Sequence, residues 1–233
     1  MVRIVKETEA GKGGFFSKLL NGVLEVSRFR LPREKIIRPS GVTECMRYIV
    51  ADILNMPMED NIDGRVQRIF DNGTYVHKRY LNGYLPKLGI VSKIFDVKTG
   101  KTKNFIEISV SNSEYWLKGS PDAVIINFED GLPYVFELKS IKAENFYGLT
   151  EPEWSYLAQI HLYMFLTGIP RALMVYESKN SQEIKEFVIK EDPSVTQKLL
   201  ERIRQIQHYV ESKTLPACEN TLGRYKCRCT TIK

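Results

Sequence analysis

The sequence lacks any hydrophobic run long enough to cross a membrane as a helix, which takes about 20 apolar residues. Its opening stretch, MVRIVKETEAGKGG, also lacks the apolar core of a secretory signal. Internal repeats and low-complexity tracts are absent, and so is the G-x-x-x-x-G-K-[ST] phosphate loop. We therefore expect a cytoplasmic protein that spans no membrane and carries no helicase motif of its own.

Cysteine is scarce, with four residues among 233. In a cytosolic chain such cysteines act as metal ligands or free thiols before they form disulfides. Hydrophobic residues make up 43% of the chain, enough for a substantial core. The formal charge of +6 permits binding to a polyanion without requiring it.

Helix and strand patterns alternate along the chain. Helical patterns cover residues 40–54, 64–85, 151–168 and 192–213. Ser40 or Thr43 would cap the first of these, and Asp192 the last. The third is apolar nearly all round, so it should be buried. Three hairpins are predicted, with strands at 91–97 and 104–110, at 122–128 and 133–139, and at 171–177 and 183–189.

This order of elements predicts one α/β domain over residues 1–233, with a central mixed β-sheet flanked by helices. Residues 1–40 would form a basic N-terminal extension, and residues 214–233 a tail that carries cysteines.

Three charged residues interrupt the apolar hairpin of GSPDAVIINFEDGLPYVFELKS. Glu137 and Lys139 point to the same face of their strand, because side chains alternate. Asp122 begins the partner strand and can approach Glu137. Two carboxylates held together repel unless a cation lies between them, and carboxylate oxygens suit Mg²⁺ and Mn²⁺. The spacing also fits a Glu–Lys pair on a solvated strand, with Asp122 as a turn residue.

The pattern Pro121-Asp122 followed by Glu137-Leu138-Lys139 resembles the PD-(D/E)XK nuclease superfamily. Two further features resemble its RecB-like branch, which includes CRISPR-adaptation nucleases and phage exonucleases. Gln159 and Tyr163 match a Q-x-x-x-Y motif on the helix that follows the catalytic strand. His77, in GTYVHKRY, resembles an upstream histidine of the metal site. The resemblance runs from about Cys45 to Cys229 and implies a restriction-endonuclease-like core.

The resemblance also implies roles for these residues. His77, Asp122 and Glu137, with the Leu138 carbonyl, would bind one or two Mg²⁺ or Mn²⁺ ions. Lys139 would position the nucleophile or stabilise charge on the phosphate. Gln159 and Tyr163 would orient the site and contact DNA. Taken without the resemblance, His77 reads as a core histidine, and Gln159 and Tyr163 as hydrogen-bonded core groups. Glu107 is a weaker candidate for a supporting acid.

The four cysteines, Cys45, Cys218, Cys227 and Cys229, resemble the iron–sulfur subset of the same branch. There, one N-terminal and three C-terminal cysteines hold a four-iron cluster. The close C-x-C pair departs from the usual wider spacing, so a structural zinc site is an alternative. Unligated cysteines are a second alternative.

A basic arm supplies candidate DNA contacts at Arg30, Arg33, Arg38 and Arg47. Tyr48 and Trp154 are among the aromatic side chains that could stack on bases. The resemblance implies a prokaryotic or phage-encoded DNA exonuclease acting on single strands or DNA ends in recombination, repair or CRISPR adaptation. It could work with a helicase or a recombination or adaptation partner. A structure-selective endonuclease and a non-catalytic DNA-binding module are the alternatives.

Overall fold

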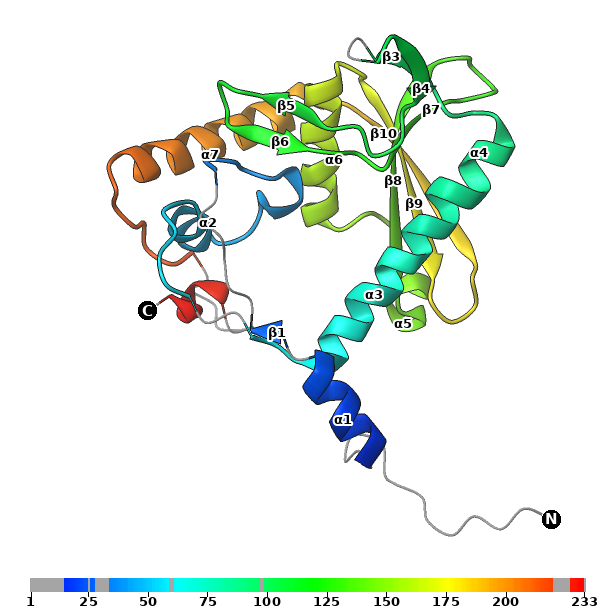
Figure 1. Ribbon diagram of the computed structural model, residues 1–233. Coiled ribbons are helices and arrows are strands. Elements are labelled where there is room, and N and C mark those ends of the chain that lie inside the picture. Colours follow the sequence, from blue (N-terminus) through cyan, green and yellow to red (C-terminus); the bar gives the residue numbers. More distant parts are fainter. Residues whose placement is uncertain are drawn as a thin grey trace, which may run out of the picture.

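A computed structural model describes residues 15–24, 26–27, 34–58, 61–96, 99–219 and 227–232. A four-stranded mixed sheet forms its centre, in the order β10-β9-β8-β7 (Figure 1). The strands are β7 (Ala123–Ile126), β8 (Pro133–Ile141), β9 (Arg171–Ser178) and β10 (Ile184–Lys190). β7–β8 and β9–β10 are antiparallel hairpins, whereas β8 and β9 run parallel. The predicted mixed sheet and these two hairpins are confirmed.

Short strand pairs surround the sheet. They are β1 (Val26–Ser27) with β2 (Asn61–Ile62), β3 (Lys93–Asp96) with β4 (Lys101–Asn104), and β5 (Val110–Asn112) with β6 (Leu117–Gly119). The predicted strand at 104–110 is wrong. β4 ends at Asn104, and Glu107 has a φ of 48°, a left-handed conformation that a continuous strand does not allow. The Glu107 N–H donates instead to the Asp122 carbonyl, at 3.0 Å.

The helices are α1 (Phe15–Leu24), α2 (Met46–Ile53), α3 (Gly64–Lys78), α4 (Leu85–Leu88), α5 (Ala143–Tyr147), α6 (Trp154–Thr167) and α7 (Pro193–Glu211). Asp63 caps α3 by accepting two backbone N–H bonds, and a π-helical turn at Arg79–Tyr84 joins α3 to α4. Gly168, in the left-handed region, ends α6, and Asp192 caps α7, as predicted. Among the described residues, no helix combines the length and apolarity that a membrane span needs.

The start of α2 differs from the prediction. The helix begins at Met46 rather than near Ser40, and its N-cap residue, Cys45, makes no side-chain cap. The Met46 N–H donates to the Glu219 carboxylate at 2.7 Å. A residue from the chain's far end therefore supplies the cap, so the local pattern placed the cap wrongly.

Helices cover both faces of the sheet. Alternate side chains of β8 enter two separate cores, because successive strand residues face opposite sides. Phe136 and Leu138 pack with Val76 of α3, Leu81 of the π-helical turn and Leu85 of α4. Val135 packs on the other face with α6 residues such as Ile160. The α6 helix is thus buried by the sheet on one side. Its other side is buried in a third hydrophobic core.

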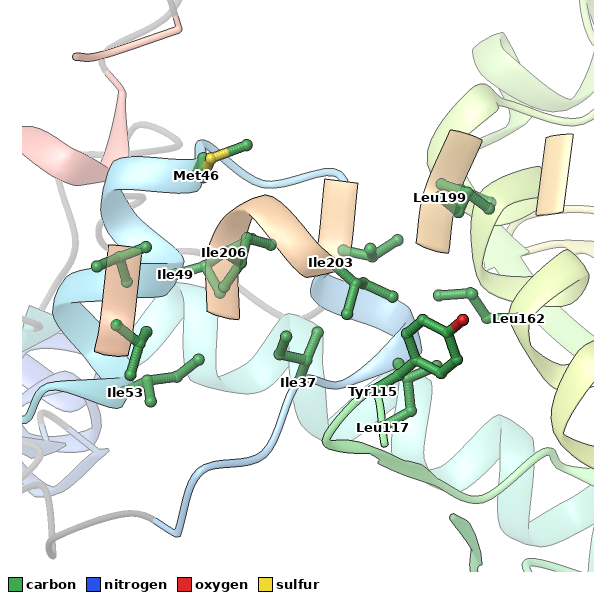
Figure 2. Close-up of a cluster of buried hydrophobic side chains, with 14 residues drawn as sticks. Ile37, Met46, Ile49, Ile53, Tyr115, Leu117, Leu162, Leu199, Ile203 and Ile206 are labelled. Atoms are coloured by element: carbon green, nitrogen blue, oxygen red, sulfur yellow. The ribbon is translucent and has the colours of Figure 1, made fainter. Parts of the chain in front are cut away.

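That third core joins α2, α6 and α7 (Figure 2). Ile49 and Ile53 of α2 meet Ile203 and Ile206 of α7 there, and Leu162 reaches in from α6. Residues from near both ends of the chain therefore share one apolar cluster with the helix that backs the sheet.

Ile203→Ala tests how much this core contributes to the free energy of unfolding, because Ile203 is fully buried. We expect a loss of about 2–5 kcal/mol in the free energy of unfolding, from lost burial and the cavity left behind. Ile184→Ala is the matched control, because Ile184 is 50% exposed and should cost less than about 1 kcal/mol. Urea denaturation measures both, and equal losses would contradict the packing described.

Candidate active site

Asp122 occupies the position that the hairpin register predicts. It precedes β7 by one residue, and Ala123 pairs with Phe136, so Asp122 lies opposite Glu137. One Asp122 oxygen accepts the Leu138 N–H at 2.7 Å. The other lies 3.2 Å from Nδ1 of His77, which α3 supplies. The strand and the helix thus fix the carboxylate from two sides.

Glu137 is the most enclosed member of the site, at 3% exposure. Its Oε1 accepts from Lys139 Nζ and from Gln159 Nε2, both at 2.8 Å. Lys139 Nζ also donates to Gln159 Oε1 at 3.0 Å, which closes a three-membered network between β8 and α6. The other Glu137 oxygen, Oε2, is buried with no hydrogen-bond partner among the described residues.

Burial and the neighbouring charges shift the pKa values of the ionisable side chains in this site. Burial, and then repulsion from Asp122, raise the pKa of Glu137 to about 7 against the opposing pull of Lys139. Burial by itself lowers the pKa of Lys139, but the Glu137 and Asp122 carboxylates outweigh it and raise it, so the amine stays charged. Burial also lowers the pKa of His77, and its contact with Asp122 outweighs this and raises it.

This donor set fits a divalent cation. A buried carboxylate oxygen without a partner loses its hydration and gains nothing in return. The second carboxylate raises that cost, and an imidazole nitrogen stands beside it. A hard cation with oxygen and nitrogen ligands would satisfy Oε2 and remove the repulsion between Glu137 and Asp122.

Tyr163 lies deeper on α6, beneath the turn that precedes Asp122. It is buried, and that burial raises its pKa to about 12. Gly119 is needed here, because a Cβ at this position would come within 3.0 Å of the Tyr163 ring and 2.9 Å of Pro39 Cδ. Tyr163 thus supports the loop that carries Asp122.

Tyr156 is a contact that the sequence reasoning missed. Its ring centroid lies 4.6 Å from Lys139 Nζ, in a cation–π geometry. Tyr156 precedes Gln159 by three residues and Tyr163 by seven, so helical spacing places all three on one face of α6. That periodicity was the available signal.

The four cysteines meet at a second site. Their sulfur atoms all lie within 4.8 Å of one another, and none forms a disulfide. Cys45 stands at the start of α2, Cys218 in the tail, and Cys227 and Cys229 at a short 3₁₀ helix, Arg228–Thr231. Burial and the neighbouring thiols raise the pKa of Cys229. A thiolate-bound metal centre fits four such sulfurs, because a cation would favour their deprotonated form.

Two arginines fasten the segments around these sulfurs. Arg202 of α7 donates to the Val42 and Glu44 carbonyls and pairs with Glu219, the cap of α2. Arg228 binds the Glu44 carboxylate at 2.8 and 2.9 Å. The tail is thereby tied to the segment that carries Cys45.

The predicted DNA-contact residues have mixed positions. Arg38 is exposed, whereas Arg47 donates to the Pro216 carbonyl at 3.0 Å and so helps to hold the tail. Arg30 and Arg33 lie outside the described residues. Tyr48 is buried under the Arg228 guanidinium, so it is no base-stacking platform, whereas Trp154 is exposed.

No protein-family model matches the chain, and no curated protein matches its sequence. Solved structures do match. An alkaline exonuclease from Laribacter hongkongensis, LHK-Exo, aligns with a TM-score of 0.54 and 16% identity, over 78% of this chain and 90% of that one. LHK-Exo in complex with dAMP aligns with a TM-score of 0.54 and 14% identity, over 84% of this chain and 93% of that one. A third structure, SSO0001, aligns with a TM-score of 0.47 and 15% identity, over 94% of this chain and 96% of that one.

The chain has a nuclease-like fold. The first two alignments span most of both chains, and the central mixed sheet between helices is the shared feature. The predicted restriction-endonuclease-like core is confirmed at the level of the fold.

The structure brings His77, Asp122, Glu137, Lys139 and Gln159 into one cluster, with Tyr163 beneath it. It rules out the solvated Glu–Lys pair, since Glu137 is buried. Its geometry suits the roles expected for these residues. Those roles remain predictions, and so does the binding of a metal by the Leu138 carbonyl.

Removal of metal should make stability depend on pH through Glu137. Its folded-state pKa, about 7, lies above the ordinary 4.5, so the folded chain holds this proton more tightly than the unfolded chain. The free energy of unfolding should therefore fall as pH rises from about 4.5 to 7, by on the order of 1–3 kcal/mol. Adding Mg²⁺ or Mn²⁺ should reverse the loss.

Urea denaturation in EDTA across this pH range measures the effect. Glu137→Gln is the control, because it is nearly isosteric and does not ionise. A variant that loses stability over the same range as fully as the wild type would assign the effect to another group.

The cysteines should act as one unit if they hold one metal centre. Cys45→Ser and Cys229→Ser should each lower the free energy of unfolding by on the order of 3 kcal/mol, about 6–12 °C in melting temperature. The double variant should lose little more than either single one, because the first change already releases the metal. Calorimetry under anaerobic conditions measures this, and additive small losses would indicate four independent thiols.

Proposed function

We propose that the chain is a divalent-metal-dependent deoxyribonuclease that hydrolyses phosphodiester bonds, acting as an exonuclease on single-stranded DNA or DNA ends. One observation carries the proposal: two carboxylates and a lysine lie together in a buried site where one carboxylate oxygen has no hydrogen-bond partner in the described part of the chain. The nuclease-like fold supports it, and so does the likeness to LHK-Exo, an alkaline exonuclease with a crystal structure in complex with dAMP.

In this proposal His77, Asp122 and Glu137, with the Leu138 carbonyl, hold Mg²⁺ or Mn²⁺. The bound ion would lower the pKa of a water molecule and polarise the scissile phosphate. Lys139 stays protonated between Glu137 and Gln159, so it can orient the nucleophile or stabilise negative charge on the phosphate oxygens.

Gln159 and Tyr163 act by positioning. Gln159 donates to Glu137 and accepts from Lys139, so it sets the direction of both side chains. Tyr163 supports the turn before Asp122 through its contact at Gly119. Both would keep the charged groups in place for the metal and the DNA.

The four cysteines are proposed to hold a structural four-iron cluster, with zinc as the alternative. Their sulfurs are clustered and the surrounding segments are fastened by Arg202 and Arg228. The visible absorbance of anaerobically purified protein separates the two, because a zinc centre is colourless.

Residues 1–233 are further proposed to form one nuclease domain, with a basic N-terminal extension. Exposed arginines such as Arg38, with Arg30 and Arg33, would bind phosphates. Recombination, repair or CRISPR adaptation would use this activity, with a helicase or adaptation protein supplying DNA ends.

Lys139→Ala tests the proposal. It should lower cleavage by on the order of 100–1,000-fold, the size of effect seen when one charge-stabilising donor is removed from an active site. Lys139→Gln keeps a donor for Glu137 without the charge, so it shows whether any loss comes from misfolding. Lys198→Ala, an exposed lysine on α7, is the matched control and should cut at the wild-type rate.

The measurement uses end-labelled linear single-stranded DNA and a circular single strand, with Mg²⁺, with Mn²⁺ and with EDTA. Metal-dependent loss of the linear DNA only is the expected result. Cutting of the circle would establish the endonuclease alternative. Binding without cleavage under every metal would favour a DNA-binding module.

A further inference from the structure

A cavity of about 620 Å³ opens beside the candidate active site, and His77 and Lys139 form part of its wall. It lies between α3 and the ends of β8 and β9, and Figure 1 shows α3 crossing obliquely in front of these strands. Its volume falls within the range of about 300–1,000 Å³ that is typical of small-molecule sites. The cavity is therefore large enough for a nucleotide, and it adjoins the proposed catalytic residues His77 and Lys139.

One wall of the cavity is apolar. Ile69 and Phe70 of α3 line it and are 41% and 48% exposed. Phe70 precedes His77 by seven residues, so the two lie on one face of the helix, about 10 Å apart along its axis. Two adjacent exposed apolar side chains on this face would gain from a planar apolar partner.

Lysines line the cavity as well. Lys139 of β8 and Lys179, which follows β9, lie across from α3, whereas Lys78 is on α3 itself, next to His77. Glu107 is the one carboxylate among the residues that line it. An aromatic wall that faces amines is the combination that proteins use for single-stranded nucleic acid, with bases stacked on the ring and phosphates beside the amines.

We propose that this cavity is a subsite for the nucleotide next to the scissile phosphate, with its base stacked on Phe70 and its phosphate held by Lys179 and Lys78. The proposal rests on the proposed nuclease function and deepens it. A base can enter the cavity only when it is unstacked from its neighbours, so the subsite selects single-stranded or frayed DNA.

Gly73 lets this proposal be tested without disturbing the fold. It lines the cavity between Phe70 and His77, and a Cβ at this position would meet nothing within 4 Å. Gly73→Leu would therefore extend into the open space that the base is proposed to occupy. Leucine forms helices better than glycine, so thermal stability should not fall.

The test uses single-stranded oligonucleotides in which one abasic nucleotide is placed at successive positions. Binding is measured by fluorescence anisotropy in EDTA, and cleavage is measured separately with Mg²⁺. For the wild type, one abasic position should weaken binding by about 5- to 150-fold, the worth of one stacked base. Phe70→Ala and Gly73→Leu should weaken binding of intact DNA by a similar factor and should lose their sensitivity to that abasic position.

Two matched controls should bind as the wild type does. Phe128→Ala removes an aromatic ring that is 86% exposed and lies outside the cavity. Gly83→Leu adds the same side chain at another helical glycine with open space around it. Lys179→Ala should weaken binding and reduce its dependence on salt.

The outcomes separate this proposal from the nuclease proposal. Abasic sensitivity that depends on Phe70, without any cleavage, would keep the subsite and overturn the nuclease. Cleavage with unchanged binding by Phe70→Ala and Gly73→Leu would overturn the subsite and keep the nuclease. Wild-type binding that ignores every abasic position would also overturn the subsite, and no DNA binding at all would overturn both.

Discussion

Burial of Glu137 opposite Asp122 is the constraint on which the rest of the site depends. A carboxylate enclosed to this degree costs several kcal/mol unless charged and hydrogen-bonding partners surround it. Lys139 and Gln159 both bond one oxygen, whereas the other has no partner within the ranges that the structure describes. The side chains that stabilise the site thus leave one buried carboxylate oxygen that a proton or, as proposed, a divalent cation would satisfy.

This arrangement requires β8 to serve two cores at once. Leu138 must enter the core beneath α3 so that Glu137 and Lys139 can face α6. Strand alternation makes the two demands compatible, because residues of odd and even number leave opposite faces. The same geometry explains why α6 is apolar nearly all round and yet carries Gln159, whose amide bonds both charged residues.

The cysteine site solves a separate problem, which is how to hold the ends of the chain together. The cap of α2 comes from Glu219, Arg202 binds both that carboxylate and the loop before α2, and the sulfurs gather beside them. Residues 173 positions apart, Cys45 and Cys218, have sulfurs 4.0 Å apart as a result. A metal there would strengthen contacts that the polar network already makes.

The sequence by itself determined the kind and order of most elements and the candidate site on β8. Caps, glycine stops and strand alternation act over a few residues, and the hairpin that joins Asp122 to Glu137 is local as well. The strand at 104–110 and the cap of α2 failed because partners distant in sequence, Asp122 and Glu219, decided them. Patterns in the residues alone did not place His77 beside Asp122, Gln159 against Glu137 or the four cysteines together; the family resemblance implied these groupings and the tertiary structure made them, along with the cavity beside Phe70. Periodicity shows which face of an element is buried, whereas the packing of the whole chain decides what that face meets.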